Sequence, residues 1–175
     1  MIGMVCLIAF ASPKAGVAQN VELLFSNADI QPAMDLKKRI KAKKLRSFNA
    51  QALYNVSTSK REGYLNTLRS TDVIVIKGNT AAKAANEVPF AQPVVIVSAS
   101  GTTPSKARGK LVRVVESSEK VQPGAARVVS VSDPSRFSLA TEDPENSMQL
   151  IVKCSAAKVD DMAVKIIEQL FAAKP

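Results

Sequence analysis

The sequence predicts a three-layer α/β domain, in which helices cover both faces of a mostly parallel β-sheet. Apolar runs alternate along the chain with amphipathic ones, the order expected of repeated strand–helix units. The runs 73–76 and 94–97 are apolar without a break, which is typical of strands buried on both faces. Strands joined through helices pair in parallel, because a right-handed crossover returns the chain to the same end of the sheet.

The first half of the chain provides three of these units. VELLFS is a short apolar run that ends at the turn-forming pair Ser26 and Asn27, and it predicts a strand. Asp29 is a suitable N-cap for the helix that follows, and Pro32 is tolerated in a first helical turn. We expect strands at 21–26, 48–56, 72–79 and 93–100, and helices from 29 to about 43, at 60–70 and at 80–88.

The second half has shorter repeats and more turn-forming residues. KLVRVVES, ARVVSVS and MQLIVKCS predict three further strands, and VDDMAVKIIEQLFAAK predicts an amphipathic closing helix with two aspartates in its first turn. The segment 133–147 contains Pro134 and Pro144, so we expect an irregular connection or an edge hairpin there.

Composition limits the chemistry that the chain can carry out. Its 175 residues suit one domain, and the formal charge of +9 favours anionic partners. Because the sequence contains no histidine, histidine-based nucleophilic catalysis and histidine-ligated metal sites are excluded. No other catalytic constellation is recognisable, and we expect no enzyme activity, no cofactor and no metal site.

The amino terminus resembles a secretory signal. An apolar stretch, residues 1–11, precedes Gly16-Val17-Ala18, which has small residues where signal peptidase reads them, although no basic residue precedes Met4. We expect residues 1–18 to be a signal peptide, 19–175 to be a single α/β domain, and the protein to be periplasmic or secreted. The alternative is that VCLIAF forms a buried first strand, which would favour a cytoplasmic protein.

A basic run is the most distinctive feature of the chain. Residues 37–46 contain seven Lys or Arg. On the predicted first helix, Ala33, Leu36 and Ile40 share the face that packs on the sheet, and the cations lie on the opposite flank. This face is either solvated or a contact surface for an anionic partner, through Lys37, Lys38, Lys41 and Lys44.

Small polar residues follow three of the predicted strands. The carboxyl ends of neighbouring parallel strands meet at one edge, where doubly wound folds bind ligands. The glycines of the known phosphate-binding signatures are missing, so these turns predict ligand binding without catalysis. The candidate ligand residues are Ser26, Asn27, Asn79, Thr80, Ser98 and Ser100.

Three stretches follow one another within residues 21–98: VELLFSNAD with its following helix, LYNVSTSKREGYLNTLRSTDVIVIKGN, and PFAQPVVIVSAS. In this order they resemble one lobe of an ABC-type periplasmic substrate-binding protein. The resemblance implies a flavodoxin-like or binding-protein-lobe fold and a ligand at the strand ends. Such proteins close two lobes around their ligand, and 175 residues supply only one.

These observations favour a non-enzymatic, exported binding module of the cell envelope. Its basic face would engage an anionic protein partner or a small anionic ligand, with contact to a membrane surface as a further option. The alternatives are a cytoplasmic nucleic-acid- or nucleotide-binding α/β domain, and a periplasmic regulator of a membrane signalling enzyme.

Overall fold

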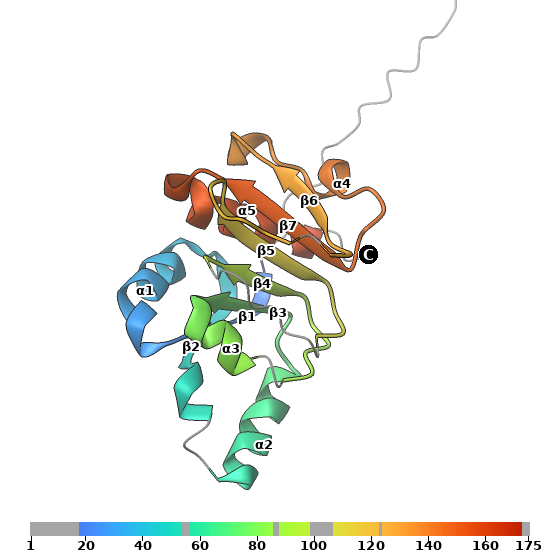
Figure 1. Cartoon of the computed structure of the whole chain (residues 1–175). Coiled ribbons are helices and arrows are strands. Elements are labelled where there is room, and N and C mark those ends of the chain that lie inside the picture. The colour runs from blue at the N-terminus through green and yellow to red at the C-terminus, as the bar shows by residue number, and fades with distance from the viewer. Residues whose placement is uncertain (1–17, 54–56, 86–87, 99–106, 123, 173–175) are drawn as a thin grey trace, which may run out of the picture.

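The fold is a seven-stranded parallel sheet between two layers of helices, which confirms the predicted three-layer α/β class (Figure 1). The computed structural model describes residues 18–53, 57–85, 88–98, 107–122 and 124–172. The strands are β1 (Ala18–Phe25), β2 (Ala42–Asn49), β3 (Val73–Lys77), β4 (Val94–Val97), β5 (Leu111–Glu116), β6 (Arg127–Ser130) and β7 (Gln149–Cys154).

The strand order is β2-β1-β3-β4-β5-β7-β6, and every pair is parallel. The described part of the chain enters the sheet in β1, moves outward to β2, and then crosses back to place β3 on the other side of β1. Leu23 consequently pairs with Ser47 on one side and with Val75 on the other. The reversal of direction between β1 and β3 is the topological switch point of a doubly wound sheet.

The larger half of the core lies between the sheet and two helices, α1 (Ile30–Arg39) and α5 (Val159–Ala172). Every second residue of β1, β3 and β4 points to this face, as a strand period of two requires. The predicted helical stripe of α5 is confirmed, because its apolar residues are fully or partly buried here. These residues are Val159, Met162, Ile166, Ile167 and Leu170.

The opposite face is covered by α2 (Thr58–Leu68) and α3 (Asn79–Ala85). Three small residues of α3, Ala81, Ala82 and Ala85, lie directly on the sheet and bring that helix close to it. Figure 1 shows α3 in front of the sheet and α5 behind it. Because alanine side chains are small, the seven-residue helix α3 can pack closely enough to cover this part of the sheet.

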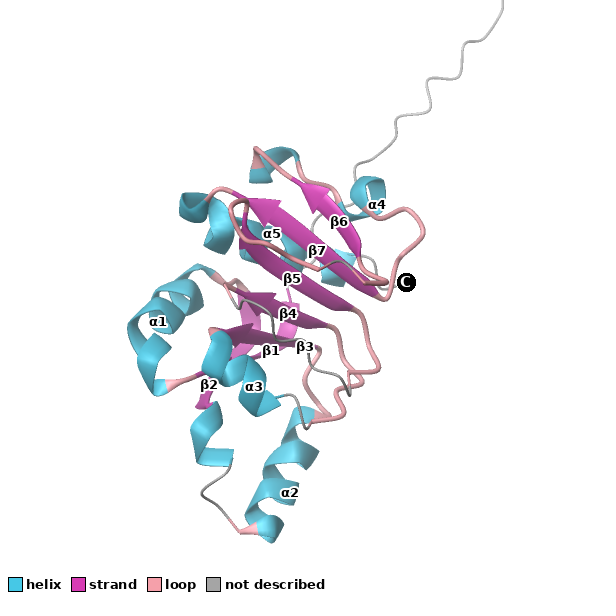
Figure 2. Cartoon of the chain, in the orientation of Figure 1, coloured by secondary structure: helices cyan, strands magenta, loops and turns pink. Residues whose placement is uncertain are grey.

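Where β5 and β7 face the same side as α2 and α3, a loop takes the place of a helix. Figure 2 shows the connection from β5 to β6 crossing in front of these strands. Arg113 of β5 lies beneath it and forms an ion pair with Glu119 (Nη2 to Oε1, 3.5 Å). Burial keeps the pKa of Arg113 below its usual value, against the opposing effect of the Glu119 charge.

Two predicted boundaries are wrong. The first helix ends at Arg39, not near Lys43, because Ile40 has an extended backbone and β2 begins at Ala42. The segment predicted as a strand at 48–56 is instead the end of β2 followed by a 3₁₀ turn, η2 (Ala50–Leu53), and its last residues lie outside the described ranges. Pairing with β1 decides both differences, since Leu45 and Phe48 of β2 pack against the two cores.

The predicted irregular connection at 133–147 is confirmed, and the signal peptide expected at the amino terminus stays a prediction. The segment 133–147 is irregular, with the 3₁₀ turn η3 (Pro134–Arg136), the short helix α4 (Leu139–Glu142) and no hairpin. The 3₁₀ turns η1 (Asn27–Asp29) and η4 (Ala156–Lys158) precede α1 and α5. The stretch VCLIAF lies outside the described residues. In the part of the chain that is described, no helix is long and apolar enough to cross a membrane.

Candidate functional site: the two edges of the sheet

The predicted ligand residues gather at the carboxyl edge of the sheet, as their positions after the strands required. Asn27 follows β1, Asn79 and Thr80 open α3 after β3, and Ser98 follows β4, and all four side chains are exposed. Ser26 is fully buried, and its hydroxyl donates to Asp29 Oδ2 (2.7 Å), so it supports the turn and is closed to a ligand. Ser100 lies outside the described residues.

A close contact joins the first two of these turns. Gly78 has a positive φ of 91°, and a Cβ on it would lie 2.0 Å from Asp29 Oδ2. Only glycine therefore fits between β3 and the Asp29 carboxylate. The Gly78 N–H also donates to the Val97 carbonyl (3.2 Å), which ties the β3 turn to the end of β4. The Asp29 carboxylate and the Gly78 N–H therefore hold these turns together.

The predicted basic face is divided between three elements. Lys37 and Lys38 belong to α1, Lys41 lies in the turn, and Lys44 lies on β2. The helical part is satisfied internally: Lys37 Nζ donates to Ser47 Oγ (2.9 Å) and Lys38 pairs with Asp35 (3.1 Å). Arg39 pairs with Asp161 of α5. The α1 cations therefore have partners within the chain, and the predicted single basic helix face is instead divided between helix, turn and strand.

Three lysines of the run remain without such partners. Lys41, Lys43 and Lys44 are exposed, and within the described ranges none of them forms an ion pair or side-chain hydrogen bond. Lys41 immediately precedes β2, and Lys43 and Lys44 lie close to its beginning; β2 is one of the two edge strands of the sheet. We call these three residues the lysine edge. Successive residues of a strand point to opposite faces, so Lys43 and Lys44 extend to either side of it.

A buried carboxylate lies next to this edge. Glu22 of β1 is only 2% exposed, and Arg46 of β2, its partner in register, places Nε 2.9 Å from Glu22 Oε2. Burial raises the pKa of Glu22, and the charge of Arg46 opposes that rise. Tyr64 of α2 stacks on Phe48 at 4.0 Å between ring centroids, and burial with the Glu22 charge raises the pKa of its hydroxyl.

A small cavity opens at the amino edge of β1, β2 and β3. Its volume is about 50 Å³, and it lies between the start of β1, the middle of β2 and the turn that leads from α2 into β3. We call it the amino-edge pocket. Its lining is mainly polar, and its residues are Asn20, Val21, Lys44, Arg46, Ser70 and Thr71.

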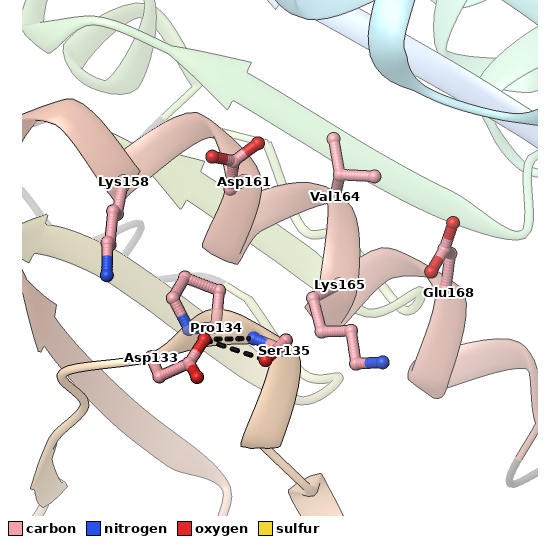
Figure 3. A pocket seen from close by; sticks show the side chains of 8 residues that line it. All are labelled: Asp133, Pro134, Ser135, Lys158, Asp161, Val164, Lys165 and Glu168. Carbon is pink, nitrogen blue, oxygen red and sulfur yellow. Dashed lines mark hydrogen bonds between the residues drawn. The ribbon is translucent and has the colours of Figure 1, made fainter.

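A larger, open groove of about 350 Å³ lies between η3 and the exposed side of α5. Figure 3 shows Lys158, Asp161, Lys165 and Glu168 along the helix, opposite the hydrogen-bonded Asp133 and Ser135. Lys158 Nζ also donates to the Ser132 carbonyl (2.8 Å). Cations and anions alternate along this groove, so it presents no charge of one sign to a ligand.

The sequence did not identify several residues that the structure brings together. Glu22 and Lys77 are charged residues within apolar strand runs, and each has a partner: Arg46 for the first, Asp160 (2.8 Å) for the second. A charge in a buried strand run is a usable signal. Thr71 and Asn20 gave none, because they meet only through the pairing of β1 with β3.

Among the residues described, no group of three or more Cys, Asp or Glu could hold a metal ion. Comparison with known proteins found no family model, no curated protein and no solved structure that matches the chain. The fold and the charge distribution are therefore the basis for any functional conclusion.

Glu22 makes the stability of the domain depend on pH. A carboxyl group with a raised pKa in the fold favours the protonated form. Its contribution to stability is therefore present below its ordinary value of 4.5 and is lost as pH rises through the raised pKa. We predict that the free energy of unfolding, wild type minus Glu22→Gln, falls from acid to neutral pH by about 1.4 kcal/mol for each pH unit by which the pKa is displaced.

Urea unfolding at a series of pH values measures this difference, and glutamine preserves the shape of the side chain while removing its titration. A difference that increases with pH would mean that Arg46 lowers the pKa more than burial raises it.

Proposed function

We propose that the protein is a non-enzymatic binding module that engages an anionic protein partner through the lysine edge. The observation that carries the proposal is the contrast within one basic run. Lys37, Lys38, Arg39 and Arg46 are all occupied by groups of the chain itself, whereas the lysine edge has no such partner among the described residues. Three positive charges therefore lie together at the start of one edge strand, where they are open to an external anion.

The position on an outer strand favours a polypeptide over a nucleic acid. No described strand pairs with the outer side of β2, so its backbone N–H and C=O groups are available to an added strand. Single-stranded nucleic acid would use aromatic side chains for stacking. The nearby aromatic residue of β2, Phe48, is instead stacked on Tyr64. An acidic, extended segment of a partner fits both the charge and the open strand.

Lysines on an edge strand also have a protective use, because charge there opposes sheet-to-sheet aggregation. Protection and binding predict different behaviour towards an acidic peptide. If the lysine edge is protective, it disfavours pairing with a strand of any sequence. If it is a binding surface, it prefers a strand that carries acidic residues. The experiment below separates the two uses.

We place this module in the cell envelope, on the basis of the secretory pattern in residues 1–18. Cleavage after Ala18 would remove only the first residue of β1 and no residue of the described core. Nucleic acid is not expected in the cell envelope. An envelope location therefore favours an acidic protein over nucleic acid as the anionic partner.

We predict that the variant Lys41→Glu/Lys43→Glu/Lys44→Glu binds an acidic peptide, such as oligoglutamate, at least tenfold more weakly than the wild type. Each exposed ion pair contributes a fraction of a kcal/mol, and reversal replaces about three attractions by repulsions. Fluorescence anisotropy of a labelled peptide measures the change. The matched control, Lys60→Glu/Lys83→Glu/Lys120→Glu, reverses three exposed lysines on other elements and should retain affinity.

An equal loss of peptide affinity in both variants would mean that net charge alone determines binding. That result would contradict a specific role for the lysine edge. Tighter binding of duplex DNA than of the peptide, with the same dependence on the lysine edge, would support the nucleic-acid alternative instead.

We predict that the protein purified from its native source begins near Gln19. Signal peptidase would cut after the small residues that end at Ala18. Intact-mass spectrometry measures the amino terminus directly. A chain that retains Met1 would contradict export, and the envelope location would be withdrawn while the lysine edge remained to be tested on its own.

A further inference from the structure

The amino-edge pocket is lined by a buried hydroxyl group that forms no hydrogen bond with the described residues. Thr71 is 4% exposed, and its Oγ1 atom is buried with no hydrogen-bond partner in the part of the chain that is described. The Thr71 backbone N–H is used, since it donates to the Leu68 carbonyl (2.9 Å). Buried polar groups in native proteins are normally paired, so an unpaired hydroxyl that lines a cavity points to a group that enters from outside.

Two cations line the same pocket. Lys44 belongs to the lysine edge and has no ion pair within the described part of the chain. Arg46 contacts Glu22 through Nε (2.9 Å). A guanidinium also carries N–H donors on its two terminal nitrogens, which can hold an oxyanion while Nε stays in place.

The acidic groups next to the pocket are already engaged. Glu22 pairs with Arg46, and burial raises its pKa. Asp72 Oδ2 accepts from the Asn20 backbone N–H (2.9 Å). Neither acid lines the cavity, so the lining combines two cations with neutral polar groups.

The Ser70 hydroxyl donates to the Thr67 carbonyl (2.8 Å), and the Asn20 side-chain amide nitrogen donates to the Ser70 carbonyl (3.4 Å). The donors left for an anion are therefore those of Lys44, Arg46 and Thr71. An anion that enters the pocket meets groups that can donate to it from several sides.

We propose that the amino-edge pocket binds a single oxyanion group, a phosphoryl or carboxylate group, held by Lys44, Arg46 and the hydroxyl of Thr71. The inference rests on the proposed function, because it names the point on the lysine edge where one anionic group is fixed. A cavity of about 50 Å³ has room for a few heavy atoms, since one water needs about 10–15 Å³ on the same scale. It therefore takes one anionic group and excludes a whole nucleotide.

The test uses the full chain and three probes: inorganic phosphate, acetate and the labelled oligoglutamate peptide. Amide chemical shifts in an NMR titration, at constant ionic strength maintained with chloride, give each dissociation constant. We expect at least one of the two small anions to shift the amides of Asn20, Lys44 and Thr71. Thr71→Val should then raise that dissociation constant about tenfold or more, because a hydrogen bond to a charged group is lost.

Thr71→Val also has a second readout that a structural hydroxyl would not give. Because Oγ1 has no partner in the free protein, its removal should leave the unfolding temperature unchanged or higher in the absence of the anion. A lowered unfolding temperature together with unchanged anion affinity would overturn the proposal.

A pair of lysine variants separates the pocket from the surface around it. Lys44→Gln and Lys41→Gln remove the same charge from neighbouring exposed positions, but only Lys44 lines the pocket. We expect Lys44→Gln to weaken phosphate or acetate binding about fivefold and Lys41→Gln to change it less than twofold, while both weaken the peptide. Equal effects on the small anion, or no small-anion shifts at all, would reject the pocket. If the peptide still depended on the lysine edge, the proposed function would stand without it.

Discussion

The middle strands of the sheet are buried on both faces, and this constraint determines where the chain can carry charge. All five residues of β3 and all four of β4 are buried. A charge placed in such a strand needs a partner, because an isolated buried ion is strongly destabilising. The three charged residues buried in strands each have one: Glu22 with Arg46, Lys77 with Asp160, and Arg113 with Glu119. The exposed charges without such partners lie away from the central strands, on β2, on the helices and in the loops.

The same constraint explains how much of the fold could be predicted from the sequence. Continuous apolar runs predicted the central strands β3 and β4, and an amphipathic stripe predicted α5. In these elements the residues that the local pattern marks as apolar are also the ones that the fold buries. The basic run was different. Its lysines and arginines favour a helix, but from Ala42 onward pairing with β1 outweighs that preference and makes a strand. Tertiary pairing of this kind leaves no local signal.

The candidate site was predictable only in part, for a similar reason. The carboxyl-edge residues were placed correctly because they follow strands, yet Ser26 is buried, and Gly78 with Asp29 fills the space between the first two turns. The sequence also did not indicate that Asp143, in the irregular segment 133–147, is buried. Asp143 pairs with Lys110; burial acts to raise its pKa, but the bonds from Lys110 and Ser147 keep it low. Thr71 gave no signal at all, since its unpaired hydroxyl is defined only by what surrounds it in space.

The proposed binding surface consists of the lysine edge and the amino-edge pocket, and it lies away from the carboxyl edge where doubly wound folds usually bind. Amide hydrogen exchange with and without the acidic peptide tests this claim most directly. We predict that the peptide slows exchange along β2 and at residues 70–72, because it adds hydrogen bonds at the open strand and fills the pocket. Protection centred on Asn27, Asn79 and Ser98, with β2 unchanged, would contradict it.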